Sequence, residues 1–259
     1  MSPGWALVAC SVLAACSTEA PPPPVVLGQY QPATLAEAVI LRDATAIENF
    51  LALGVDPNEP EPDGTTPLMR AVHGQMPNTA RQLIDAGADV KKANSYGVTA
   101  LYIAARAGDS AATQMLLAAG ADANAALPAS GETVLMTAAK AGNPDVVRAL
   151  LTGGVSGVSL AQLGEARAAA RVAEAAGYSL LPNPAVATNY ADVNARERLY
   201  GRTALMIAAV EGHAEAVRLL VEAGSDLNIV DEEGSTALSL ARSYGNLDVA
   251  AQLAEAGAR

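Results

Sequence analysis

The sequence has few aromatic residues, few histidines, few cysteines and a deficit of positive charge. One Phe, one Trp and seven Tyr among 259 residues exclude a core built around large rings. Lys and Arg number 16 against 27 Asp and Glu, and the resulting net charge of −11 argues against a nucleic-acid partner. Because alanine is abundant and has the highest helix propensity, the composition predicts an array of short, closely packed helices.

Both cysteines lie at the start of the chain. Cys10 and Cys16 leave no thiol downstream, so the rest of the chain cannot form a disulfide or a cysteine zinc site. An apolar run over residues 5–15 is too short to span a bilayer and has the length of the apolar region of a signal peptide. The composition of this segment therefore indicates export.

The run ends in Leu-Ala-Ala-Cys at Cys16, which resembles the lipobox of bacterial lipoproteins. The resemblance implies that residues 1–15 are a lipoprotein signal peptide and that Cys16 becomes an acylated N-terminus held in the lipid bilayer. Ser17 follows the cysteine in place of Asp, which in a Gram-negative host implies an outer-membrane lipoprotein facing the periplasm. Because no Lys or Arg precedes the apolar run, an ordinary cleaved signal or a disordered tail stays an alternative.

Residues 16–29 are predicted to form a Pro-rich tether. The four consecutive prolines at 21–24 have no amide donors and impose a polyproline II conformation. Such a segment extends by about 3 Å per residue, so it would hold the rest of the chain away from the lipid surface.

Two glycine series share one period. Glycines two residues before a threonine are Gly64, Gly97, Gly131, Gly201 and Gly234, with spacings of 33, 34, 70 and 33. A second series is Gly54, Gly87, Gly120, Gly154, Gly224 and Gly257, with spacings of 33, 33, 34, 70 and 33. Two independent markers with one period indicate a repeat array. The spacing of 70 equals two periods, so a degenerate unit is predicted between Ser159 and Tyr200.

Each unit contains the signals of two short helices. Thr99 precedes an apolar helical pattern and is placed to cap it, and Gly108 is placed to end it. Alanine pairs then allow close packing of the first helices, and leucine pairs such as Leu116-Leu117 supply the second helices. Gly120 and the Ala-Asp-x-Asn turn that follows it close the unit.

This unit resembles the ankyrin repeat. The resemblance implies an all-α ankyrin-repeat solenoid of paired short helices with β-turn finger loops over residues 30–259. It would contain about seven units, of which the first, at about 30–63, and the fifth are degenerate. The family uses the concave surface of fingers and inner helices to hold partner proteins, so the function is expected on that surface.

The residues give little support for catalysis. His73 and His213 are the only histidines, and they are interpreted as a surface residue and a structural residue of the repeat. The recurring Asp residues are turn formers instead of metal ligands, and no phosphate-binding loop is present. The chain is therefore predicted not to be an enzyme and to need no cofactor or metal. The alternative is an enzyme that uses the fifth unit and the loop at Pro182 and Pro184.

Partner-binding residues are predicted on the fingers and the inner helices. Tyrosines precede the repeat glycine or occupy an inner helix, and charged residues accompany them, as at an interface hot spot. The predicted set is Tyr96, Tyr102, Arg106, Tyr200, Arg202, Glu232, Glu233 and Tyr244. Bracing of the fingers by the tyrosines, and simple solvation of the charges, are the alternatives.

These observations predict a non-catalytic protein-binding module on the periplasmic side of the envelope, held there by a lipid anchor. Its partner is expected to be an envelope protein, and the chain itself is expected to be monomeric. An immunity protein that neutralises a periplasmic toxin is the main alternative.

Overall fold

The computed structural model describes residues 32–155, 159–175 and 189–259. The predicted signal peptide and tether, with Cys16, and the loop with Pro182 and Pro184 lie outside these residues. The chain divides into residues 1–31 and a compact unit of residues 32–259, which contains everything described below.

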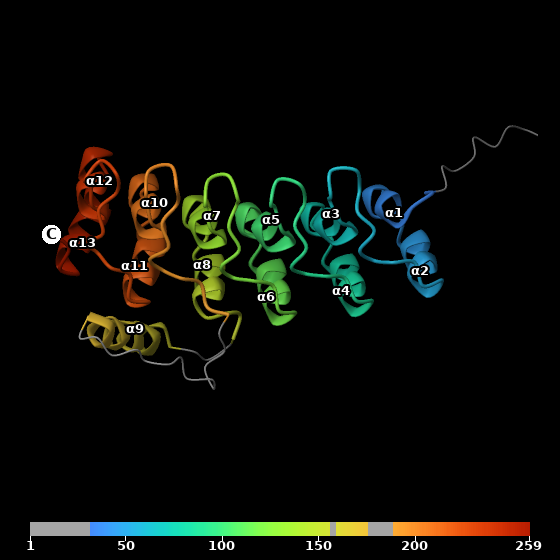
Figure 1. Ribbon diagram of the computed structural model, residues 1–259, viewed down its shortest axis with the longest axis horizontal. Coiled ribbons are helices and arrows are strands. Elements are labelled where there is room, and N and C mark those ends of the chain that lie inside the picture. Colours follow the sequence, from blue (N-terminus) through green and yellow to red (C-terminus); the bar gives the residue numbers. More distant parts are fainter. Residues whose placement is uncertain (1–31, 156–158, 176–188) are drawn as a thin grey trace, which may run out of the picture. The chain divides into compact units, whose positions relative to one another are not determined.

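The described residues form thirteen helices and no β-strand. Inner helices are α1 (Leu35–Leu41), α3 (Pro67–His73), α5 (Ala100–Ala107), α7 (Val134–Ala141), α10 (Ala204–Glu211) and α12 (Ala237–Ser243). Outer helices are α2 (Ala44–Ala52), α4 (Pro77–Asp85), α6 (Ser110–Ala118), α8 (Pro144–Leu151), α11 (Ala214–Glu222) and α13 (Leu247–Glu255). Inner helices pack on neighbouring inner helices, outer helices pack on outer ones, and the pairs stack side by side (Figure 1). The predicted all-α repeat solenoid is confirmed.

Helix α5 begins and ends as the sequence predicts. The Thr99 hydroxyl accepts a hydrogen bond from the Tyr102 N–H, and Gly108 ends α5 with a φ of 68°. The same threonine cap recurs at Thr66, Thr133, Thr203 and Thr236. Each cap satisfies an N–H that has no partner within its helix and is worth about 1 kcal/mol.

The core contains alanines on the inner helices and leucines on the outer helices. Ala104, Ala138 and Ala208 are fully buried where the inner helices pack closely. Leu116 and Leu150 are also fully buried, on the outer helices. Burial of a leucine side chain contributes about 1.5–3 kcal/mol, so the stack is held together by contacts between neighbouring pairs.

A finger loop precedes each inner helix after α1. The first to fifth fingers are residues 59–65, 92–98, 126–132, 195–202 and 229–235. Backbone hydrogen bonds connect neighbouring fingers, from the Arg198 N–H to the Ser130 carbonyl at 2.7 Å and from the Glu232 N–H to the Tyr200 carbonyl at 2.8 Å. The fingers therefore form one continuous edge beside the inner helices.

The stack continues across the predicted fifth unit without adding a pair. Helix α7 packs directly on α10, and α8 packs on α11. In the described residues between Ser159 and Tyr200, the structure has α9 (Leu160–Ala175) and part of the fourth finger, and no inner and outer helix pair. Without residues 155–190, Gly131 and Gly201 would be 34 residues apart, which is one ordinary repeat. The structure thus differs from the predicted degenerate unit, because these residues form an insertion.

Helix α9 lies beside the outer helices, next to the end of α11 (Figure 1). Leu160 is 2% exposed, and the Arg167 guanidinium donates to the carbonyls of Ala223 at 2.8 Å and Ala191 at 3.2 Å. A Cβ on Gly164 would lie 2.3 Å from the Glu222 carbonyl oxygen, so only glycine fits this contact. Among the described residues, no helix has both the length and the apolar character needed to cross a bilayer.

Candidate functional site

A pocket of about 220 Å³ opens on the inner-helix side, between α7, α10 and the two fingers that precede them. Its apolar lining comes from Leu199 and Tyr200 of the fourth finger and from Ile207 and Val210 of α10. Glu132, Lys140, Glu197, Arg202 and Glu211 supply its charged groups, together with the hydroxyl-bearing Ser130. The pocket offers an apolar wall beside both signs of charge, which suits a protein side chain.

Glu197 holds the fourth finger in shape. Its carboxylate accepts hydrogen bonds from the backbone N–H groups of Leu199 at 2.5 Å, Tyr200 at 2.7 Å and Arg202 at 3.1 Å. The residue is only 9% exposed, so the carboxylate lies within the turn it closes. An ionised acceptor gives stronger hydrogen bonds than a neutral one, and three of them fix the backbone that carries Tyr200.

Arginine side chains join the fourth finger to its neighbours. Arg198 donates to the Pro128 carbonyl of the third finger at 2.7 Å. Arg196 donates to the Val230 carbonyl of the fifth finger at 2.8 Å. These bonds tie three successive fingers together, which limits the conformational entropy that a partner would have to remove on binding.

Arg202 connects Tyr200 to the fifth finger. Its guanidinium carbon lies 5.0 Å from the centroid of the Tyr200 ring, and its Nε lies 3.5 Å from a carboxylate oxygen of Asp231. The Asp231 side chain is fully buried and also accepts from the N–H groups of Glu233 and Ser235. The guanidinium therefore contacts the face of the tyrosine ring while Asp231 compensates its charge.

Large apolar side chains are exposed on this rigid edge. Leu199 is 63% exposed, Tyr200 50% and Val230 45%. Exposed aromatic and aliphatic residues on a preorganised loop are the usual anchors of protein interfaces, because they bury large areas at low entropic cost.

Seven of the eight predicted site residues fall into three places. Tyr200 and Arg202 line the pocket, and Glu232 and Glu233 are exposed on the adjacent fifth finger. Tyr96, 71% exposed on the second finger, and Arg106, exposed near the end of α5, belong to an earlier pair. Tyr244 is 58% exposed and follows α12, at the opposite end of that helix from its finger. The structure thus brings together four of the eight predicted residues.

Tyr102 is not a surface residue, contrary to the sequence prediction. It is 9% exposed, in the first turn of α5. Met69, Met136 and Met206 occupy the same position after their capping threonines, and each is at most 1% exposed. The repeat places this position inside the stack, so the Tyr102 ring fills core volume.

The two histidines of the described residues lie on different helix pairs and outside any cluster of possible metal ligands. His213 precedes α11, and its Nε2 lies 3.1 Å from the Lys140 carbonyl oxygen. His73 is exposed at the end of α3. Within residues 32–155, 159–175 and 189–259, no three His, Cys, Asp or Glu side chains gather as they would around a metal ion.

The family model for ankyrin repeats in three copies matches residues 35–127, 103–181 and 167–259. The chain belongs to the ankyrin-repeat family. Ankyrin repeat and KH domain-containing protein mask-1 of Caenorhabditis elegans is 34% identical over 218 residues, which are 82% of this chain and 8% of that protein. E3 ubiquitin-protein ligase KEG of Arabidopsis thaliana is 32% identical over 128 residues, which are 49% of this chain and 6% of that protein.

The chain therefore spans less than a tenth of the length of either of these relatives. What it shares with both is the repeat array. Ankyrin repeats are protein-binding modules and are generally not catalytic. Membership of the family makes this chain a protein-binding module, and it leaves the choice of partner to residues outside the repeat pattern.

Proposed function

We propose that this ankyrin-repeat chain binds an envelope protein through the pocket beside Tyr200 and is displayed on the periplasmic side of the outer membrane by an acylated Cys16. The observation that carries the binding site is the pair of exposed side chains, Leu199 and Tyr200, on a finger fixed by Glu197. Ile207 and Val210 form the adjacent apolar wall. The lipid anchor is inferred from Leu-Ala-Ala-Cys at Cys16 and from the Pro-rich tether after it.

Site-specific photocrosslinking in intact cells tests the binding site. A photoreactive phenylalanine analogue at Tyr200 should give one crosslinked band, because the ring is exposed at the mouth of the pocket. The matched control carries the analogue at Leu53, which is 81% exposed at the end of α2. A Leu199→Ser substitution should remove the band at Tyr200 by weakening the apolar contact about tenfold. Equal crosslinking from both positions would contradict the proposed site.

Cell fractionation tests the anchor. The Cys16→Ser variant should move from the membrane fraction to the soluble periplasmic fraction, because the serine hydroxyl cannot enter the lipoprotein modification pathway. Cys10→Ser is the matched control and should stay with the membrane. A membrane pool of Cys16→Ser as large as that of the wild type would disprove the lipoprotein assignment.

A further inference from the structure

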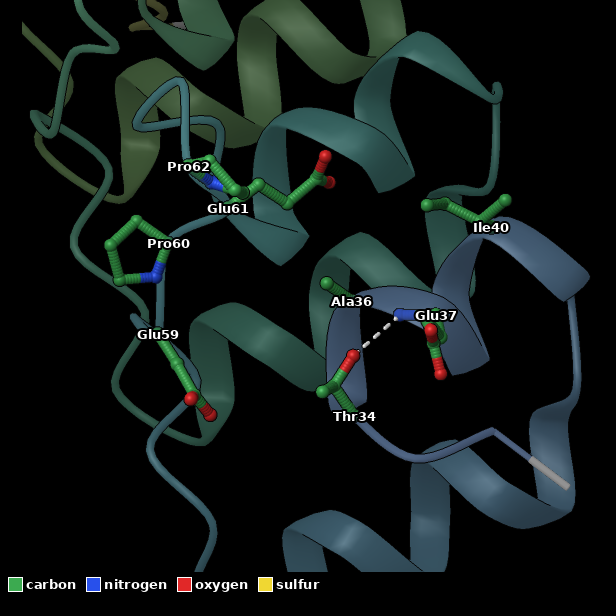
Figure 2. Close-up of a pocket in the computed structure, with 8 residues that line it drawn as sticks. All are labelled: Thr34, Ala36, Glu37, Ile40, Glu59, Pro60, Glu61 and Pro62. Atoms are coloured by element: carbon green, nitrogen blue, oxygen red, sulfur yellow. Dashed lines mark hydrogen bonds between the residues drawn. The ribbon is translucent and has the colours of Figure 1, made fainter.

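A larger pocket, of about 380 Å³, lies at the N-terminal end of the stack, between α1 and the first finger (Figure 2). Ala36 and Ile40 of α1 and the rings of Pro60 and Pro62 provide its apolar surface. Among the described residues no finger precedes α1, and this face of the helix lies towards residues 59–62. It is separate from the Tyr200 pocket, which lies between α7 and α10.

Apolar and acidic groups share this pocket. Ile40 is 54% exposed, although it is a large aliphatic side chain. Figure 2 shows Glu37 on α1 and Glu59 on the first finger, on two sides of the pocket. Glu59 is exposed, and its side chain makes no hydrogen bond or ion pair among the described residues. The third carboxylate, that of Glu61, is held by Arg70 at 2.6 and 2.5 Å.

The pocket lies in a strongly acidic part of the stack. Residues 32–64 contain seven Asp and Glu and one basic residue, so they carry a net charge of −6 out of −11 for the chain. The basic residue, Arg42, donates to the Gly74 carbonyl at 2.7 Å. Hydrogen bonds from the Thr65 N–H and hydroxyl lower the pKa of Asp63, so this neighbour is also ionised at neutral pH.

We infer that this pocket docks a cationic segment of a partner protein, with an aliphatic side chain against Ile40 and the proline rings and a Lys or Arg beside Glu37 and Glu59. The charge of residues 32–64 selects such a segment and speeds its encounter with the pocket. A second copy of this chain is a poor occupant because both copies would carry −11. The inference depends on the proposed protein-binding role, but it uses a different surface, so either site can fail alone.

Fluorescence anisotropy with the full-length chain tests this pocket. The probe is a labelled peptide, Pro-Leu-Lys-Lys-Leu-Lys, and its control has Glu in place of each Lys. Glu37→Gln with Glu59→Gln should weaken probe binding about tenfold, because two charged contacts become neutral. The matched control, Glu48→Gln with Glu255→Gln, removes the same net charge from exposed positions on α2 and α13 and should change binding less than twofold.

Three results would overturn the inference. Equal weakening by the two double variants would mean that the probe follows the overall negative charge alone. Binding of the Glu-containing peptide as tight as that of the probe would exclude a cation-selective pocket. A dimer in sedimentation velocity that Glu37→Gln with Glu59→Gln disrupts would assign the pocket to a second copy. An Ile40→Ala variant, which leaves all charges in place, should weaken the probe about fivefold by removing the apolar contact.

Discussion

The Glu197→Ala variant should lose about 2–4 kcal/mol of unfolding free energy and most of its partner binding. Alanine leaves the N–H groups of Leu199, Tyr200 and Arg202 without the carboxylate that now accepts from all three. Without these hydrogen bonds the turn that presents the Tyr200 ring is less stable. The backbone amides of the finger should therefore exchange their hydrogens faster. Urea denaturation and hydrogen exchange of residues 198–202 measure the two effects.

Two other substitutions separate this role from a general loss of charge. Glu197→Gln keeps one oxygen acceptor in the turn and should show a smaller loss. Glu211→Ala removes an exposed carboxylate from the same pocket and should change the unfolding free energy by less than about 0.5 kcal/mol. If Glu197→Ala were as stable as Glu211→Ala, with an equally protected finger, the carboxylate would not be what holds the turn.

The repeat array could be predicted because its determinants are local and recur. A capping threonine, a glycine with positive φ and buried leucine pairs reappear in unit after unit. Each acts within one unit or on its immediate neighbour, so the period alone aligns them. The N-caps at Thr99 and Thr203 follow from this alignment.

The chemistry of the fingers was harder to predict because it depends on neighbouring units. Nothing in the sequence distinguishes Arg196 and Arg198 from solvated charges, yet they donate to backbone carbonyls 34 and 70 residues away. Glu197 and Leu199 were not among the predicted site residues at all. The available signal was an acidic residue flanked by two arginines in a finger, but its three backbone donors become apparent only once the turn is folded.

Tyr102 could have been assigned correctly from the sequence. Met69, Met136 and Met206 stand at the same position after the capping threonine, and a long apolar side chain repeated at one register indicates core. The general preference of tyrosine for interfaces misled the prediction because it ignores that register. Position within the repeat is therefore a better guide to exposure than residue type.

The spacing of 70 residues allowed two interpretations, a degenerate unit or an insertion inside an ordinary one. Alanine-rich residues 160–175 are helical in either case, so helix propensity does not distinguish them. The distinction comes from contacts distant in sequence, because the Asn189 amide binds the Ala121 carbonyl at 2.7 Å and its oxygen accepts from the Ala123 N–H at 3.1 Å. These bonds return the chain to the stack after the insertion.

Docking of α9 should fail in the Gly164→Ala variant although alanine favours the helix itself. The added methyl would lie 2.3 Å from the Glu222 carbonyl oxygen and 3.2 Å from the Gly224 nitrogen, and both are backbone atoms that cannot rotate away. Alanine raises helix propensity by about 1 kcal/mol, so a stabilised but undocked α9 is expected. Limited proteolysis should then cut within residues 159–175 at least tenfold faster, while α11 stays protected.

Arg167→Ala offers a second route to the same state without a steric clash. It removes the hydrogen bonds to the Ala223 and Ala191 carbonyls. It also removes a positive charge from the C-terminal end of α11, where the helix dipole favours a cation. Ala161→Ser, at an exposed position of α9, is the matched control and should leave cleavage unchanged. If Gly164→Ala instead melted α10 and α11 together with α9, the insertion would be an integral element of the stack. Cleavage confined to the insertion would mean that α7 packing on α10 and α8 packing on α11 are sufficient to hold the stack across it.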